Sequence, residues 1–217
     1  MEPDAVEIRV LGCLIEKQRT TPDAYPLSLN ALRLACNQST NRHPVVDYDE
    51  AVIRDALQHS YRRGWTRLTS GHGSRAAKYR HLLDEALGLA PDELALLGVL
   101  MLRGAQTPGE LKQRSERLHR FEDLAAVEAT LAALIGRGHV AQLARQPGQK
   151  EERYAQLLGA EASDEHAAPS LAPHEAAAPA PAPAPLPPAA EQRIARLERE
   201  VAELRGALAA LRADLGA

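Results

Sequence analysis

The feature of this sequence that most restricts its fold is an internal repeat. The run EIRVLGCLI at Glu7–Ile15 resembles ELALLGVLM at Glu93–Met101, 86 residues later. Further landmarks recur in the same order: Thr21-Pro22 and Thr107-Pro108, Arg63-Gly64 and Arg137-Gly138, and Tyr79 and Tyr154 with Leu-Leu three residues on. Each copy of a repeat is usually one structural unit, so we expect two related domains, residues 1–87 and 88–160. The separation falls from 86 to 74 residues, which makes the first copy 12 residues longer between Pro22 and Arg63.

Each copy has the same predicted order of elements. Apolar residues at helical spacing predict a first helix over about 4–18 and a third over about 49–63, with counterparts in the second copy. Ser28 and Thr107 have residue types that cap the second helix. The third helix of each copy should end at a glycine, Gly64 or Gly138, because glycine tolerates the left-handed conformation of a helix end. Two strand-like runs around a polar turn then complete each copy.

Three helices followed by a β-hairpin are typical of a winged helix. The predicted fold class is therefore mainly α with small β-hairpins (α+β). It comprises two tandem winged-helix domains plus a C-terminal coiled-coil helix.

The end of the chain has a different composition. Residues 161–190 are mostly Ala and Pro, which predicts a semi-rigid linker. Residues 191–217 form a heptad pattern that predicts a parallel homodimeric coiled coil. The alternative is a helix that folds back onto the protein's own core, but the strict 3.5-residue period favours pairing between chains. The predicted dimerisation residues are Ile194, Leu197, Val201, Leu204, Leu208, Leu211 and Leu215.

Several blocks of the sequence together resemble the YceH-type family of bacterial proteins. They are residues 10–45 (VLGCLIEKQRTTPDAYPLSLNALRLACNQSTNRHPV), 102–111, 143–154 and the terminal heptads. The resemblance implies a pair of winged-helix domains. The family has no assigned biochemical function, so the resemblance implies no catalytic residues. It suggests DNA binding only through the analogy of fold.

Composition restricts the location and class of the protein. The net charge of −3 gives no bulk basic character, and the two cysteines form no CxxC pair. Reduced thiols suit the cytoplasm. No apolar run approaches the roughly 20 residues that span a bilayer, and the N-terminus lacks the layout of a signal peptide. We therefore expect a cytoplasmic protein without membrane contact.

The stretch CNQSTNRHPVVDYDE, residues 36–50, gathers side chains that could bind metal or catalyse a reaction. No second histidine lies at a zinc-type spacing from His43. Asp47 and Glu50 fit a capping box at the start of the third helix better. No catalytic triad or phosphate loop occurs elsewhere in the sequence. We expect no catalytic residue, no metal, no cofactor and no enzymatic activity.

Two spans without Asp or Glu, residues 24–46 and 56–83, indicate a basic face on the first domain. Lys and Arg supply most non-specific affinity for duplex DNA. Against base reading, the start of the third helix is acidic, where a recognition helix normally contacts bases. We expect weakly specific binding of double-stranded DNA by the wing, the end of the third helix and the 38–44 loop. The candidate residues are Asn41, Arg42, Arg62, Arg63, Arg67, Arg75 and Lys78.

The alternative is a protein–protein interaction scaffold that uses winged-helix domains without binding DNA. The near-neutral second copy, the linker and the heptads fit this hypothesis. The sequence leaves both alternatives open.

Overall fold

The structure, a computed structural model, describes residues 2–69, 77–144 and 151–159. The chain divides into two units, Met1–Ser170 and Leu171–Ala217, and every described residue belongs to the first. The predicted linker, the predicted coiled coil and Arg75 lie outside the described residues.

The first copy of the repeat combines three helices with a three-stranded antiparallel sheet. The sheet order is β1-β3-β2, with Leu27 opposite Tyr79 and Leu68 opposite Tyr79 on its other side. The short strand β1 and the 3-10 turn η1 were not expected from the sequence. The elements are α1 (Ala5–Thr20), η1 (Pro22–Ala24), β1 (Leu27–Ser28), α2 (Leu29–Cys36), α3 (Glu50–Arg62), β2 (Thr66–Thr69) and β3 (Lys78–His81).

The second copy has the same order of helices and an antiparallel hairpin. An isolated bridge between Gln106 and Tyr154 takes the place that β1 and β3 occupy in the first copy. A short helix that the sequence did not predict connects the copies. The elements are α4 (Leu83–Leu87), α5 (Pro91–Arg103), α6 (Pro108–Ser115), α7 (Leu124–Gly136), β4 (Val140–Leu143) and β5 (Arg153–Gln156). The described residues thus combine helices with small antiparallel sheets, which confirms the α+β class.

Local signals fixed most helix boundaries. Ser28 accepts a hydrogen bond from the backbone N–H of Ala31, and Thr107 forms a capping box with Glu110, as predicted. Gly64 and Gly138 have φ of 76° and 72°, also as predicted.

The predicted cap of the third helix was wrong by two residues. Asp49, not Asp47, accepts a hydrogen bond from the backbone N–H of Val52 and starts α3. The Asp47 carboxylate instead accepts a hydrogen bond from the side-chain amide of Asn37 at 3.3 Å. Asn37 also bonds both backbone groups of Tyr48, which holds this residue outside the helix that begins after Asp49.

The repeat alignment also needs one correction. The first helices begin 86 residues apart, the second helices 79 apart (Leu29 and Pro108) and the third helices 74 apart (Glu50 and Leu124). Thr107, the cap of α6, therefore corresponds to Ser28, whereas Thr21 ends α1. The extra length of the first copy is divided between the α1–α2 connection and the α2–α3 connection.

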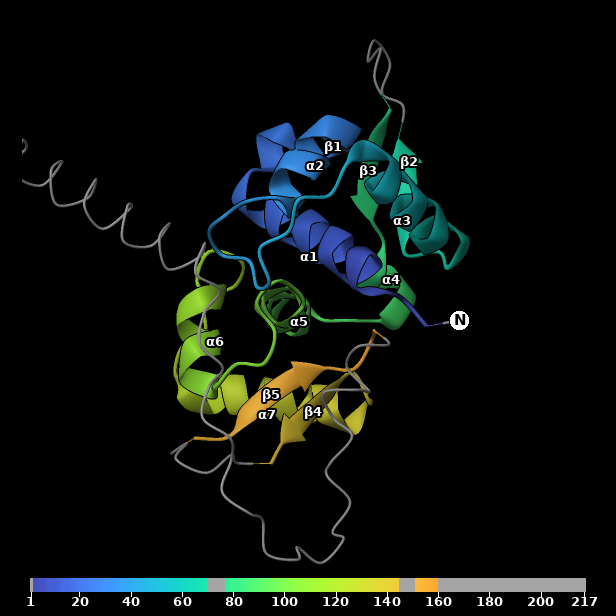
Figure 1. The fold of residues 1–217 in the computed structure, drawn as a ribbon. Helices are drawn as coiled ribbons and strands as arrows, with labels where there is room; N and C mark the ends of the chain where they lie inside the picture. Colours follow the sequence, from blue (N-terminus) through green and yellow to red (C-terminus); the bar gives the residue numbers. More distant parts are fainter. Residues whose placement is uncertain (1, 70–76, 145–150, 160–217) are drawn as a thin grey trace, which may run out of the picture. The chain divides into compact units, whose positions relative to one another are not determined.

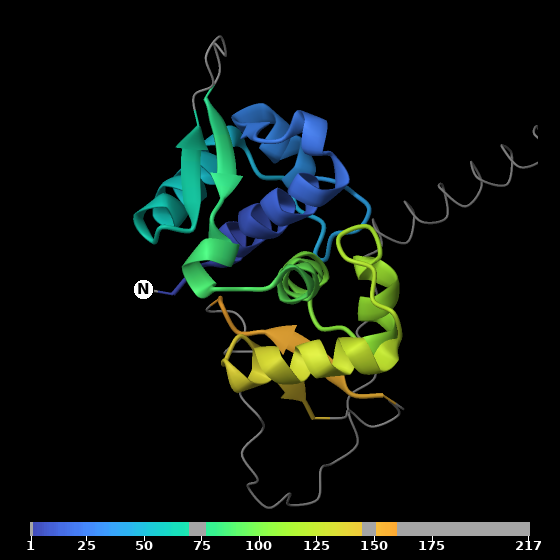
Figure 2. The same ribbon diagram turned by 180° about the vertical axis from the view of Figure 1, so that it is seen from behind.

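The two copies share their cores through α1 and α5, which lie at the centre of the described structure in both views (Figures 1 and 2). Residues Ile8, Leu11 and Ile15 of α1 pack in the core of the second copy. Leu102 of α5 packs in the core of the first copy. The third helix and hairpin of each copy lie on opposite sides of this central pair (Figure 1).

The contact between α1 and α5 is reciprocal. A Cβ added at Gly12 would lie 2.9 Å from Leu102 and 3.0 Å from Met101, and one at Gly98 would lie 2.9 Å from Ile15. Gly12 and Gly98 are equivalent in the repeat, and so are Ile15 and Met101. Equivalent residues exchange places across the contact, as in an isologous dimer interface.

Candidate functional site

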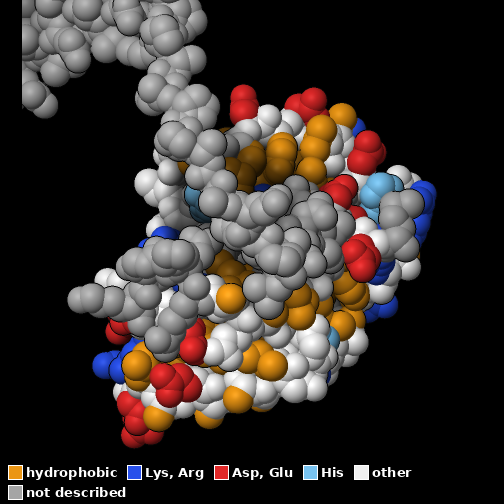
Figure 3. Space-filling model, turned by 60° about the horizontal axis from the view of Figure 1, so that its bottom comes forward, with side chains coloured by type: hydrophobic (Ala, Val, Ile, Leu, Met, Phe, Trp, Pro, Cys, Tyr) orange, Lys and Arg blue, Asp and Glu red, His pale blue; other side chains and the backbone are white. Residues whose placement is uncertain are grey.

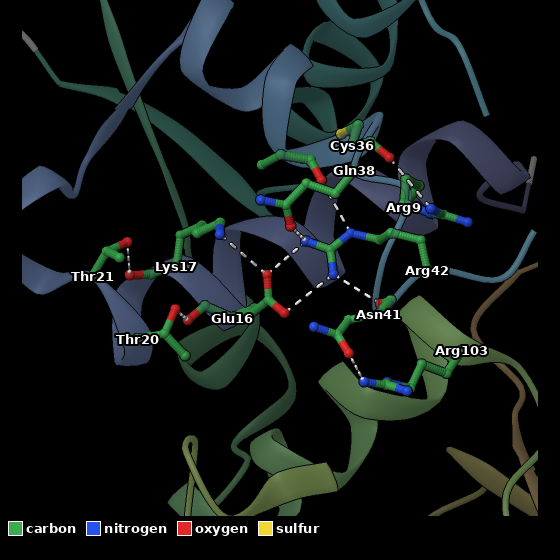
Figure 4. Close-up of polar contacts among 11 residues, drawn as sticks. Arg9, Glu16, Lys17, Thr20, Thr21, Cys36, Gln38, Asn41, Arg42 and Arg103 are labelled. Atoms are coloured by element: carbon green, nitrogen blue, oxygen red, sulfur yellow. Dashed lines mark hydrogen bonds and ion pairs between the residues drawn. The ribbon is translucent and has the colours of Figure 1, made fainter. Parts of the chain in front are cut away.

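The loop after α2 is organised around a buried arginine. The Arg42 side chain is 0% exposed, and its guanidinium lies between α1 and the end of α2 (Figure 4). It donates to the Glu16 carboxylate at 2.6 and 3.1 Å, to the backbone carbonyl of Ala35 at 3.0 Å and to Gln38 at 2.9 Å. Burial would lower the pKa of Arg42, but the hydrogen bonds with Glu16 and the electrostatic attraction of the surrounding groups together raise it.

This geometry overturns the assignment of Arg42 to a DNA-contacting surface. Its donors are satisfied inside the protein, and phosphate cannot reach a side chain without exposed surface. A positive charge in an acid-free span is not evidence of exposure when its partner, Glu16, lies 26 residues earlier in the chain.

The same loop joins the two copies of the repeat. The backbone N–H of His43 donates to the carbonyl of Leu102 at 2.8 Å. Arg103 donates to the Asn41 side chain, and Asn41 has a φ of 61° (Figure 4). The Asn41 side chain is therefore engaged by α5 of the second copy, whereas the sequence predicts that it contacts DNA.

Arg63 is engaged by an ion pair that both copies of the repeat contain. Its Nε lies 3.2 Å from Glu7, whose side chain is 2% exposed, and its guanidinium lies 5.8 Å from the Trp65 ring centre. In the second copy Arg137 lies 2.9 Å from Glu93. The arginine of the repeated Arg-Gly landmark thus forms an ion pair that connects the end of the third helix to the first helix. This pair accounts for Arg63 without any DNA contact.

The remaining predicted cations gather around α3 and the hairpin of the first copy. Arg62 and Arg67 are exposed, and Lys78 is half-buried on β3. Arg67 lies directly opposite Arg80 in the β2–β3 register, and Arg80 is paired with Glu85 at 2.6 Å. Like charges directly opposite each other destabilise a sheet, so the Arg67 side chain does not stabilise the β2–β3 pair.

A crevice of about 540 Å³ lies between α3 and β2 on this face. Arg54 and Arg67 stand at its sides, with the exposed side chains of Tyr61 and Leu68. Arg54 was not among the predicted residues because it lies next to Asp55, just before the acid-free span. The exposed position of Arg54 on α3 adds it to the candidate cations.

The equivalent face of the second copy is chemically different. Positions 74 residues later replace Arg54 by Glu128, Gln58 by Ala132 and Tyr61 by Ile135. The sequence of α7 contains no Lys or Arg. Exposed apolar side chains on α7 are Leu124, Ala125, Ala129, Ala132, Ala133 and Ile135. The two third helices therefore present different surfaces on similar scaffolds.

A metal site receives little support from the described residues. Within the described ranges, one group of three suitable side chains (Asp4, Glu7 and His59) has ligand atoms within 4.8 Å of one another. Glu7 already accepts from Arg63 and from the backbone N–H of Asp4. The positive end of α1 also opposes a cation there.

No helix in the described part of the chain is both long and apolar enough to cross a membrane.

Comparison with known proteins identifies the family. Residues 4–149 match the family described as "Protein of unknown function, DUF480". The chain belongs to this family. Its relatives include a UPF0502 protein of Pelobacter propionicus, which is 50% identical over 95% of this chain and 91% of the relative. A UPF0502 protein of Geotalea uraniireducens is 51% identical over 92% and 89% of the two chains. The UPF0502 protein YceH of Salmonella paratyphi B is 42% identical over 99% and 98%. The resemblance to YceH-type proteins is confirmed.

Proposed function

We propose that this protein is a non-enzymatic tandem winged-helix protein that binds duplex DNA with weak sequence specificity through its first copy. The order α1-β1-α2-α3-β2-β3 and the antiparallel sheet order β1-β3-β2 support a winged helix in that copy. In such folds the third helix and the wing face DNA together.

The observation that carries this proposal is the set of exposed cations shared by α3 and the wing. Arg54, Arg62 and Arg67 are exposed, and Lys78 is half-buried beside them in the hairpin. The span from Ala56 to Leu83 has no carboxylate that would repel phosphate. Phosphate contacts position a protein on DNA without reading sequence.

Weak specificity follows from the start of α3. Glu50 and Asp55 are exposed on the part of the helix that would approach base edges. Carboxylates there repel the DNA backbone, although one can accept a hydrogen bond from cytosine. Base contacts are therefore few, and affinity comes from charge.

Fluorescence anisotropy of the full chain with a labelled DNA duplex tests this function. Four phosphate contacts predict a loss of about 100-fold in affinity between ~50 and ~200 mM salt. Arg62→Gln with Arg67→Gln should abolish the shift, whereas Lys112→Gln with Arg120→Gln, an equal change of charge on the second copy, should leave most of it. No binding at low salt would refute DNA binding.

A second candidate function, a protein-interaction scaffold, is favoured by the apolar surface of α7. Leu124 is 43% exposed and Ile135 is 38% exposed, with exposed alanines between them. Figure 3 brings this side of the molecule forward, with hydrophobic side chains along its lower part and acidic side chains at one end. Such a surface offers nothing to phosphate but suits the apolar face of a partner helix.

Site-specific cross-linking in cells separates the scaffold from the DNA-binding function. A photoreactive amino acid in place of Ala132 should form one discrete protein adduct, and Ile135→Glu should remove it. The same photoreactive group in place of Gln58 on α3 is the matched control. Equal adducts from both positions would contradict a specific role for α7.

A further inference from the structure

We propose that the junction between the two copies contains a binding site for a small organic phosphate. The site is a cavity of about 420 Å³ formed by the end of α1, the loop at Asn41, the second half of α5, and α6 with the turn after it. Ligand sites in proteins commonly occupy cavities of this size where two structural units meet. The inference is independent of the proposed function, because this cavity and the α3 crevice have no lining residue in common.

Three arginines from the second copy line the cavity. Arg103 lies at the end of α5, Arg114 in the last turn of α6, and Arg117 in the turn that follows. Guanidinium groups bind phosphate through two parallel hydrogen bonds, so three arginines around one cavity are suited to this group. Burial lowers the pKa of Arg103, and the charges of Arg114 and Arg42 lower it further. An anion in the cavity would relieve that repulsion.

The carboxylates near the cavity do not cancel this charge. Glu16 lines the cavity but lies 2.6 Å from the buried Arg42 and 3.7 Å from Lys17. Glu110 is shared between Arg114 at 3.2 Å and Arg153 at 3.5 Å. Glu116 is the remaining acidic group of the lining, and Arg103 and Arg117 outnumber it. The balance of the lining is positive.

The rest of the lining suits the organic part of a ligand. Val99, Leu102 and Leu118 supply an apolar wall, and Asn41 and Gln113 supply amide groups. Arg103 extends to the first copy, where it donates a hydrogen bond to the amide oxygen of Asn41, a neutral side chain. An apolar wall facing a cationic rim fits a molecule with a phosphate at one end and a planar or apolar body at the other, such as a mononucleotide.

Isothermal titration calorimetry of the full chain tests this site with three probes: inorganic phosphate, AMP and adenosine. We expect saturable binding of AMP, weaker binding of phosphate and weakest binding of adenosine. Adenosine equal to AMP would overturn phosphate recognition, and phosphate equal to AMP would overturn the role of the apolar wall. No saturation by AMP or phosphate at ~10 mM would overturn the site itself.

Variants locate the binding. Arg103→Gln and Arg117→Gln should each weaken AMP by about 10- to 100-fold, the loss expected for one charge-assisted hydrogen bond. Arg120→Gln makes the same change of charge on an exposed residue outside the lining and should change affinity less than about twofold. Thermal melts without ligand show that each variant is folded. Equal weakening by Arg120→Gln would overturn the site in favour of general charge attraction. Because no DNA is present, the outcome is separate from that of the DNA titration.

Discussion

Arg63 Nε lies 3.2 Å from the buried carboxylate of Glu7, and the repeat reproduces this pair as Arg137 and Glu93. The glutamate occupies the third position of the first helix, where it also accepts from the backbone N–H that starts the helix. Each pair therefore joins the beginning of one helix to the end of another. It is a property of the scaffold that both copies need.

Arg63→Gln should destabilise the protein by about 2 kcal/mol, because Glu7 would remain buried without its cation while Arg63 itself is partly exposed. Urea unfolding measures this loss. The neighbouring exposed Arg62→Gln should change stability by less than about 0.5 kcal/mol. Duplex DNA affinity should show the reverse order, with the larger effect at Arg62. Equal stability losses would contradict this division of roles.

Arg42→Met should cost about 3 kcal/mol, because it leaves Glu16 and the Ala35 carbonyl without their donor in a buried site. Arg33→Met, on α2 beside its own partner Asn30, is the control and should have a small effect. Hydrogen exchange gives a second readout. The amide of His43 should exchange faster in Arg42→Met, since the loop that holds it to Leu102 would loosen. Unchanged exchange would argue that the loop is held without Arg42.

Gly12→Ala and Gly98→Ala should each destabilise the protein. Alanine gains about 1 kcal/mol of helix propensity, but the added Cβ would lie 2.9 Å from a side chain of the other helix. Overpacking of this kind costs about 1–3 kcal/mol, so the net effect should be unfavourable. Gly136→Ala at the end of α7 meets nothing within 4 Å and should be neutral or stabilising. Thermal melts of the three variants compare these effects directly.

Stability should fall as pH decreases from 6.5 towards 4 because of His81. Burial lowers the pKa of His81 to about 4, from an ordinary value of 6.5. Its ring accepts from the backbone N–H of Leu83 and contacts Gln18 at 2.8 Å, which fits the neutral form. Between these pH values the unfolded chain binds a proton that the folded chain excludes, so protonation favours unfolding.

His81→Gln should flatten this pH dependence, and urea midpoints at pH 7, 6, 5 and 4 would show it. The loss from pH 7 to 4 attributable to His81 is at most about 3 kcal/mol. The same slope in His81→Gln and the wild type would contradict the assignment.

The heptad pattern of residues 191–217 predicts that the full chain is a dimer. A protein ending at Ala190 should contain fewer chains per particle. Light scattering coupled to size-exclusion chromatography measures both. Leu204→Glu is a milder test, because a charge at a d position disrupts pairing without removing the segment. Equal numbers of chains per particle for the full and shortened proteins would favour the alternative in which the heptad segment packs on its own chain.

The repeat could be predicted because the two copies share residues in the same order. The helix caps could be predicted because they depend on neighbours within a few residues. Ser28, Thr107, Gly64 and Gly138 act through adjacent backbone groups, and all four were predicted correctly. The cap of α3 was missed because the side chain of Asn37, ten residues away, takes the Asp47 carboxylate.

The shared core and the loop clamp depend on contacts that no local pattern reveals. Arg42 was assigned to the surface because unpaired arginines are seldom buried, and its partner Glu16 is remote in sequence. The sequence does contain one signal of a structural ion pair. Glu7 and Arg63 recur together as Glu93 and Arg137, and a charge pair kept in both copies points to a structural partnership.

The exchange of Gly12 with Gly98, and of Ile15 with Met101, is the contact that a homodimer of one copy would make about a two-fold axis. In such a homodimer every substitution on the third helix would occur twice. A single chain that carries both halves escapes this constraint: α3 can hold arginines while α7 holds alanines, and the common scaffold is unchanged. The covalent link thus converts a symmetric assembly into one whose two faces can specialise independently.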